Sequence, residues 1–228
     1  MRLSIIVPTL NEAARLAATL APLQAMRARG VEVIVADGGS KDDTKSIAKR
    51  FADRVIDAPR GRARQMNAGA AAASGDTFLF LHADTVLPAD ADRHIATALD
   101  HEAHWGRFDV AISGGHWMFP VIAWFINRRS RLTGIATGDQ GLFFARRTFE
   151  DMGNFPDQPL MEDVEFCKRA RRVGAPACLK VRVQTSGRRW EKHGVFKTIV
   201  LMWVLRARYF LGEAPESLHR AYYEKPAA

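Results

Sequence analysis

The sequence contains little cysteine and no long apolar run. Cys167 and Cys178 are the only two cysteines in 228 residues, and their spacing supports neither a disulfide framework nor a thiolate zinc site. No segment reaches about 18 uncharged apolar residues, so we expect no membrane span. The first residues enter an apolar stretch without a basic leader, so we expect no secretory signal. Together these absences favour a cytoplasmic protein.

Two nucleotide-binding fingerprints are missing as well. No Gly-x-Gly-x-x-Gly follows the first apolar run, and no Gly-x-x-x-x-Gly-Lys-Ser/Thr occurs anywhere, which disfavours a dinucleotide fold and a P-loop. We also find no internal repeat. The formal charge of +8 favours anionic partners, which could be small-molecule phosphates, acidic lipid or nucleic acid.

Short apolar runs alternate with helical patterns through the first hundred residues. The strand-like runs are 3–7, 31–36, 54–57 and 78–81, with helical patterns at 11–30, 42–51 and 61–73. This alternation predicts an α/β fold with a mostly parallel central sheet and flanking helices. Further along we expect a strand at 108–113, a polar turn entering a strand at 138–145, a helix opening at 162 and a basic loop at 186–193.

Acidic residues stand where several of these elements begin or end. Asp37 and Asp84 follow apolar strands, Asp139 lies in a polar turn, and Glu162 and Asp163 open a helix. Ligands collect at the carboxyl ends of strands in open α/β sheets, and carboxylate oxygens suit Mg²⁺ or Mn²⁺. Each acid alone also has an ordinary explanation as a turn or first-turn residue.

Basic residues accompany these acids in two segments. The helix pattern at 61–69 carries Arg62 and Arg64, and the loop near residue 188 carries Arg188 and Arg189. Acids that could hold a metal, together with arginines that could hold phosphate, provide the components for moving a group off a nucleotide diphosphate.

The order of these segments resembles the family 2 glycosyltransferases, whose fold is the GT-A type. The matching pieces span about residues 3–190 and are Ser4–Glu12, Val35–Thr44, Arg62–Gly69, Leu81–Thr85, Met161–Asp163 and Arg189–Trp190. The segment Gly61–Asn67 and the small size also resemble a bacterial subgroup linked to arsenosugar biosynthesis. The resemblance implies one GT-A domain at 1–194, with a nucleotide-binding half at 1–100 and an acceptor-side half at 101–194. A C-terminal amphipathic helical tail would follow at 195–228.

The resemblance also implies a role for each matching position. Nucleotide binding would fall to Pro8, Thr9, Glu12 and Asp37, with uracil the common base, and Arg64 in preference to Arg62 would hold the base or the diphosphate. Asp163 would be the catalytic base, and Glu162 could share the proton. The acceptor or phosphate side would be lined by Asp139, Gln140, Arg188, Arg189 and Trp190.

The metal position departs from the family pattern. Asp84 matches the last acid of the family's Asp-x-Asp metal motif, but His82 stands where the first acid is expected. Mg²⁺ could be held by Asp84, the diphosphate and water, or His82 could favour Mn²⁺.

The resemblance implies an inverting hexosyltransferase-like enzyme that uses a nucleotide-diphosphate sugar, with a UDP-sugar favoured and the acceptor unidentified. The alternatives are a sugar nucleotidyltransferase, another nucleotide-binding α/β protein, or a basic module that binds membrane or nucleic acid. Nucleic acid is disfavoured as a partner because the sequence does not interleave exposed aromatic residues with basic residues, as a stacking platform for nucleobases would.

Two apolar aromatic segments have two readings each. Residues 117–126 could lie in a membrane interface or form a buried helix, and 195–211 could anchor the protein to acidic lipid or pack on the core. We expect reversible binding of 195–211 to the inner face of the cell membrane, helped by the basic charge.

Overall fold

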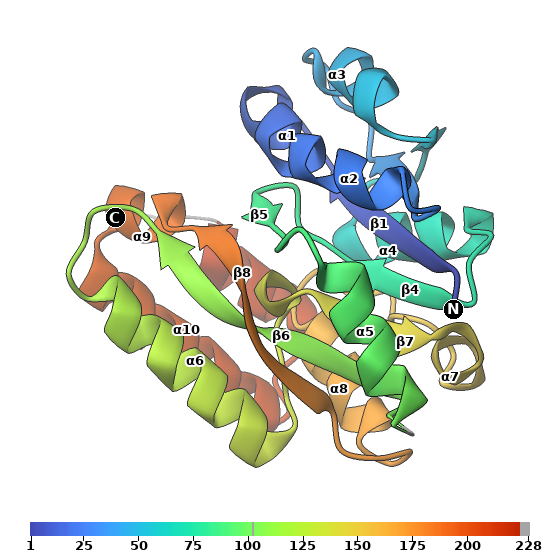
Figure 1. The fold of residues 1–228 in the computed structure, drawn as a ribbon. Coiled ribbons are helices and arrows are strands. Elements are labelled where there is room, and N and C mark those ends of the chain that lie inside the picture. The colour runs from blue at the N-terminus through green and yellow to red at the C-terminus, as the bar shows by residue number, and fades with distance from the viewer. Residues whose placement is uncertain (102, 224–228) are drawn as a thin grey trace.

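The computed structural model describes residues 1–101 and 103–223, and within them the chain forms one curved eight-stranded sheet with helices on both faces (Figure 1). The strand order is β3-β2-β1-β4-β7-β6-β8-β5. The strands are β1 (Leu3–Thr9), β2 (Glu32–Asp37), β3 (Arg54–Asp57), β4 (Thr77–Phe80), β5 (Thr85–Val86), β6 (Trp105–Ser113), β7 (Leu142–Ala145) and β8 (Ala177–Ser186).

Four of the seven strand pairings are parallel, which confirms the expected α/β fold with a mostly parallel sheet. The parallel pairs are β1–β2, β1–β4, β2–β3 and β6–β8, and β7 is antiparallel to both of its neighbours. β1, β2 and β4 are almost wholly buried because helices cover both faces, which explains their unbroken apolar runs.

Helices and single turns connect the strands. They are α1 (Ala13–Leu20), η1 (Ala21–Leu23), α2 (Gln24–Arg27), α3 (Thr44–Phe51), α4 (Arg62–Ala72), α5 (Ala91–Asp100), α6 (Phe119–Thr133), η2 (Gly138–Gln140), α7 (Arg146–Asp151), α8 (Glu162–Ala170), α9 (Arg188–His193), α10 (Val195–Phe210) and α11 (Pro215–Tyr223). The expected basic loop after β8 was wrong, because residues 188–193 form the short helix α9 between Gly187 and Gly194.

A cluster of aromatic rings fixes α8 against one face of the sheet. Phe166 of α8 lies with its ring centroid 4.9 Å from Phe144, 5.1 Å from Phe149 and 4.7 Å from Phe155. All four rings are buried. Well-packed aromatic pairs stabilise a fold by more than their buried area alone. These contacts therefore hold α8 in place, and with it the first turn that carries Glu162 and Asp163.

The C-terminal segment packs on the domain through part of its surface. Leu205 of α10 and Leu218 of α11 are fully buried in the same core cluster as the aromatic rings. The segment after residue 194 therefore contacts the core, while α10 also exposes large apolar side chains.

Candidate active site

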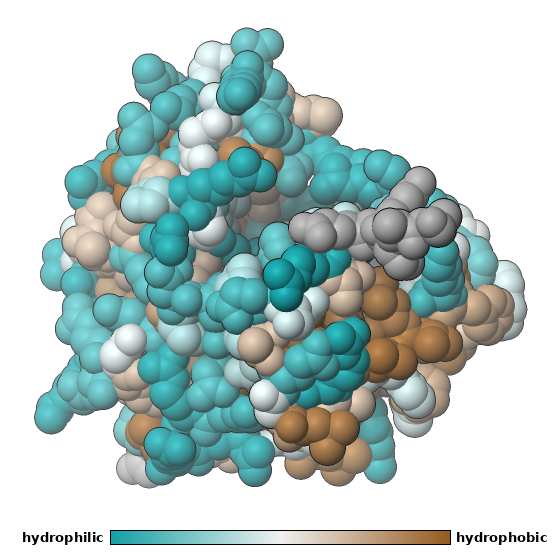
Figure 2. Space-filling view, turned by 180° about the vertical axis from the view of Figure 1, so that it is seen from behind, coloured by the Kyte–Doolittle hydropathy of each residue, from teal (hydrophilic) through white to brown (hydrophobic). Residues whose placement is uncertain are grey.

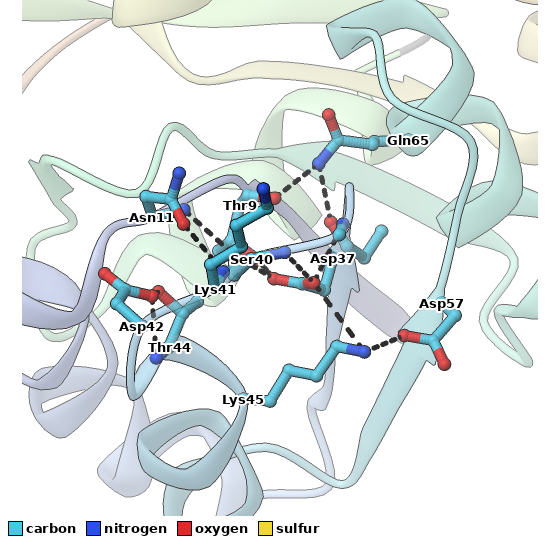
Figure 3. Close-up of polar contacts among 12 residues, drawn as sticks. Thr9, Asn11, Asp37, Ser40, Lys41, Asp42, Thr44, Lys45, Asp57 and Gln65 are labelled. Carbon is cyan, nitrogen blue, oxygen red and sulfur yellow. Dashed lines mark hydrogen bonds and ion pairs between the residues drawn. The ribbon is translucent and has the colours of Figure 1, made fainter.

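Asp37 lies at the carboxyl end of β2 and is completely buried (Figure 3). One of its carboxylate oxygens accepts hydrogen bonds from the backbone N–H groups of Gly39 and Ser40, at 3.0 and 2.8 Å. The other accepts from the hydroxyls of Ser40 and Thr9, at 2.5 and 3.1 Å. Burial disfavours the charged form, but these donors outweigh it and lower the pKa of Asp37. The charged carboxylate fixes the turn that follows β2.

Side chains also join the loop after β1 to the loop after β2. The Ser40 hydroxyl accepts from the Asn11 N–H at 2.8 Å, and the Asn11 side-chain oxygen accepts from the Lys41 N–H at 2.8 Å (Figure 3). Gln65 of α4, buried beneath, donates to the Thr9 and Ala36 carbonyls at 2.7 and 2.9 Å. Gln65 was not among the predicted site residues, although it directly follows Arg64 in the matched 62–69 segment.

A second group of charges surrounds Asp84, in the loop between β4 and β5. The Arg188 guanidinium lies 3.9 Å from the Asp84 carboxylate and 3.7 Å from that of Glu12. Burial raises the pKa of Glu12, and the Asp84 charge adds to this while Arg188 opposes it. A pocket of about 200 Å³ opens beside these groups, lined by Asp84 with Arg15, Ala18, Thr19, Val86, Ser113, Gln184 and Ser186.

A third group lies at the start of α8. The buried carboxylate of Glu162 forms a 3.1 Å ion pair with Arg62 of α4. Asp163 accepts the Gly138 N–H at 2.8 Å. Met161, immediately before them, adopts a left-handed backbone with φ 65°, a conformation that costs a non-glycine residue roughly 1 kcal/mol or more. The fold thus holds the two acids in a strained, fixed turn.

The environment of Asp163 is suited to proton transfer. Burial, together with the neighbouring Glu162 charge, raises the pKa of Asp163 to about 6 against the opposing effect of the Gly138 N–H and Arg62. A carboxylate with that pKa is charged at neutral pH and is a stronger base than an ordinary aspartate.

His82 connects the Asp84 loop to Asp163. Its ring lies so close to Gly138 that a Cβ added there would stand 2.3 Å from Nε2. Nε2 is buried without a hydrogen-bond partner among the described residues. Burial, helped by the Arg62 charge, lowers the pKa of His82 to about 3, so the imidazole is neutral. Because the Gly138 N–H also donates to Asp163, the 82–84 loop and the start of α8 both contact Gly138.

Asp139 and Gln140 differ in their surroundings. Gln140 is fully buried and donates to the Ser130 hydroxyl at 3.1 Å, so it braces the η2 turn. Asp139 has one buried oxygen without a partner in the described part of the chain, and burial raises its pKa. Arg129 of α6, which sequence reasoning missed, has two buried guanidinium nitrogens that also have no hydrogen-bond partner among the described residues. Burial lowers the pKa of Arg129, and the charges of Asp139 and Asp163 oppose this effect.

The other arginines lie apart from one another. Arg64 forms a 2.7 Å ion pair with Asp157 at the surface, whereas Arg62, two residues earlier, faces Glu162. Arg189 lies 3.5 Å above the Tyr222 ring and donates to the Tyr222 carbonyl at 3.1 Å, so α11 folds back over this side. Trp190 packs instead with the apolar start of α6.

The residues that could hold a metal are few. Among residues 1–101 and 103–223, no three His, Cys, Asp or Glu side chains gather closely enough to form a protein-only metal site. Asp84 supplies one partly exposed carboxylate, and a metal there would take further ligands from a bound diphosphate and water.

Comparison with known proteins assigns the family. Residues 4–153, well over half of the chain, match the family model described as Glycosyl transferase family 2. The chain belongs to glycosyltransferase family 2. This confirms the resemblance to the family. The arsenosugar subgroup is not confirmed by these comparisons.

Mycobacterial glycosyltransferases are among its relatives. A PGL/p-HBAD biosynthesis glycosyltransferase of Mycobacterium bovis is 40% identical over 108 residues, which cover 43% of this chain and 42% of the relative. Another glycosyltransferase of that species is 30% identical over 138 residues, 57% of this chain and 61% of the relative. The match thus spans only about two fifths of the first relative's length.

Solved glycosyltransferases share the fold. The mannosyltransferase PcManGT of Pyrobaculum calidifontis, solved with GDP-Man and Mn²⁺, superposes with TM-score 0.70 at 21% identity over 97% of this chain and 68% of its own. Staphylococcus aureus TarS, solved with UDP-GlcNAc, gives 0.67 at 19% identity, covering 82% and 58%. These likenesses confirm the GT-A fold.

Proposed function

We propose that this glycosyltransferase transfers a sugar, with inversion, from a nucleotide-diphosphate donor to an acceptor hydroxyl. The observation that carries the proposal is the environment of Asp163, a half-buried carboxylate with a pKa of about 6 beside the loop that carries Asp84. UDP-sugars are the favoured donors, and the solved relatives bind UDP-GlcNAc or GDP-Man. A sugar nucleotidyltransferase, the alternative, gains no support from the family match.

The donor would lie across the carboxyl ends of β1, β2 and β4. We assign nucleotide binding to the loops that carry Pro8, Thr9, Glu12 and Asp37, where Asp37 also sets the shape of the turn. Arg62 is the arginine that faces the catalytic acids, and Arg64 would reach a nucleotide only after leaving Asp157. Residues 1–100 and 101–194 remain the proposed donor and acceptor halves, with 195–228 as the tail.

The reaction separates two charges. Asp163 would accept the proton of the acceptor hydroxyl while the hydroxyl oxygen attacks the anomeric carbon of the donor sugar. The bond from that carbon to the diphosphate would break on the opposite face of the sugar. Glu162, already paired with Arg62, would tune this base. Arg188 lies where it could neutralise the departing diphosphate.

A divalent metal fits the Asp84 position, as Mn²⁺ accompanies the nucleotide in PcManGT. Asp84 would hold it, with the neutral His82 adjacent, and the metal would withdraw charge from the diphosphate when bound. Asp139, Gln140, Arg189 and Trp190 would form or support the acceptor side. We also propose that the enzyme works in the cytoplasm at the inner face of the cell membrane.

Asp163→Asn tests the base assignment without knowledge of the acceptor. Transfer to water, followed as release of nucleoside diphosphate from a UDP-sugar, should fall by about 10² or more, because a general base contributes that much. UDP binding should stay within about twofold of wild type. The melting temperature at neutral pH should not fall, because a carboxylate with a raised pKa costs stability once charged. Unchanged turnover would remove Asp163 from its role.

A further inference from the structure

Helices α6 and α10 each present a regular stripe of large apolar side chains to solvent. The exposed apolar residues Phe196 to Val204 of α10 follow one another at intervals of four, three and one positions, as expected for one face of a helix. The residues Trp117 to Phe125, just before and within α6, repeat these intervals. The exposed fractions run from 40% to 87%, for Trp117, Val121, Trp124, Phe125, Leu132, Phe196, Val200, Trp203, Val204, Phe210 and Leu211.

The opposite faces of both helices are already committed to the protein. Phe119 and Ile122 of α6 form one buried cluster with Val195 of α10, so the two helices lie side by side (Figure 1). The Asn127 side chain accepts the Val110 N–H at 2.8 Å and donates to the Val110 carbonyl at 3.0 Å. These contacts fix α6 on β6, so the helix cannot turn its stripe inward.

The two stripes contain most of the exposed large apolar side chains of the described residues. Eleven of the fourteen exposed large apolar side chains in the described residues belong to them, and Figure 2 shows brown groups gathered on the side where α10 lies. Single exposed apolar residues are common on soluble proteins, but contiguous aromatic patches mark interaction sites.

The charges around the stripes indicate which partner fits. Neither α6 nor α10 contains an acidic residue, whereas Arg128 lies within the α6 stripe and Lys197 is exposed nearby. Tryptophan, which supplies three members of the face, suits the boundary between lipid headgroups and acyl chains. No helix in the described residues is long and apolar enough to cross a membrane.

We propose that the joint α6–α10 face is a docking surface for an anionic lipid bilayer, with both helices lying parallel to the membrane plane. The surface includes the 117–126 segment as well as 195–211. The net charge of +8 adds long-range attraction to the same lipids.

The position of this face also indicates where a lipid-borne acceptor would enter, an inference that rests on the proposed function. Phe119 at the start of α6 packs against the backbone of Gly187, directly after β8. Ser113 and Ser186, at the ends of β6 and β8, line the pocket next to Asp84. A membrane-lipid acceptor would therefore approach the Asp84 side of the site from the docked face.

Vesicle flotation tests the surface without an acceptor. Wild-type protein should float with phosphatidylcholine vesicles that contain phosphatidylglycerol, bind phosphatidylcholine alone at least about tenfold more weakly, and show a blue shift of tryptophan fluorescence on binding. Trp124→Gln with Trp203→Gln should weaken binding at least about tenfold, and Arg128→Glu about fivefold or more. The matched controls Val173→Gln and Arg147→Glu alter exposed residues elsewhere and should bind as wild type.

Three outcomes would overturn the inference: no flotation of wild type, flotation unchanged in the α6–α10 variants, or a dimer in light scattering that the double tryptophan variant abolishes. The last would assign the face to a second copy of the chain. A thermal shift by UDP with Mn²⁺, measured without vesicles, should be equal in wild type and the double variant. If flotation fails while that shift persists, the docking inference falls and the proposed function stands.

Discussion

At the scale of single residues, the proposed role of Asp163 as the base predicts how the rate depends on pH. The base must be charged to accept a proton, so donor turnover should fall as the pH drops through about 6. In Glu162→Gln one negative neighbour is removed and Arg62 is freed from its ion pair, and both changes favour the charged form of Asp163. We therefore expect the acid limb of kcat to move to lower pH in that variant.

The measurement is the rate of nucleoside diphosphate release from about pH 4.5 to about pH 8, a range that extends to both sides of the Asp163 pKa. Glu165→Gln is the control, because Glu165 lies on α8 but pairs with Lys168 and the Tyr209 hydroxyl. An acid limb that stays in place in Glu162→Gln would show that another group titrates.

At the scale of elements, the sheet depends on close contact between β6 and its neighbours. A Cβ on Gly106 would stand 2.4 Å from the Ala177 carbonyl oxygen of β8 and 2.4 Å from the Phe143 ring of β7. Gly106→Ala should therefore lower the free energy of unfolding by about 1 to 3 kcal/mol, since the strands on both sides must move. Urea denaturation measures the change.

Gly115→Ala provides the matched control for that strand variant. A Cβ at Gly115 meets nothing within 4 Å, and this glycine is not among those with positive φ. Its stability should stay within about 0.5 kcal/mol of wild type. Equal stability of the two alanine variants would mean that the sheet tolerates the added methyl group.

At the scale of the whole molecule, donor binding should stabilise the fold. A ligand present at about 100 times its dissociation constant adds about 2.7 kcal/mol. UDP with Mn²⁺ should raise the melting temperature more than either alone if Asp84 helps to hold the metal, and Asp84→Asn should remove the extra shift. Asp57→Asn, which alters an exposed acid that contacts Lys45, serves as the control. A shift by nucleoside triphosphate alone would instead favour the nucleotidyltransferase alternative.

Much of the fold was predictable because its signals are local. Buried parallel strands need unbroken apolar runs, and helices carry their periodicity in consecutive residues, so β1, β2 and β4 were recognisable in the sequence. The ordered acids and arginines then indicated the family, which the family match confirmed. Helix α9 was missed because six residues between two glycines, five of them charged or polar, also have the composition of a loop.

The sequence by itself determined the parallel sheet, the family and the identity of the acids, since each depends on neighbouring residues or their order. Only the tertiary structure decided that Arg62 faces Glu162 while Arg64 faces Asp157. It also decided that α6 and α10 pack against each other while each leaves large apolar side chains exposed. Pairings of this kind join residues tens of positions apart, and local propensity carries no information about them.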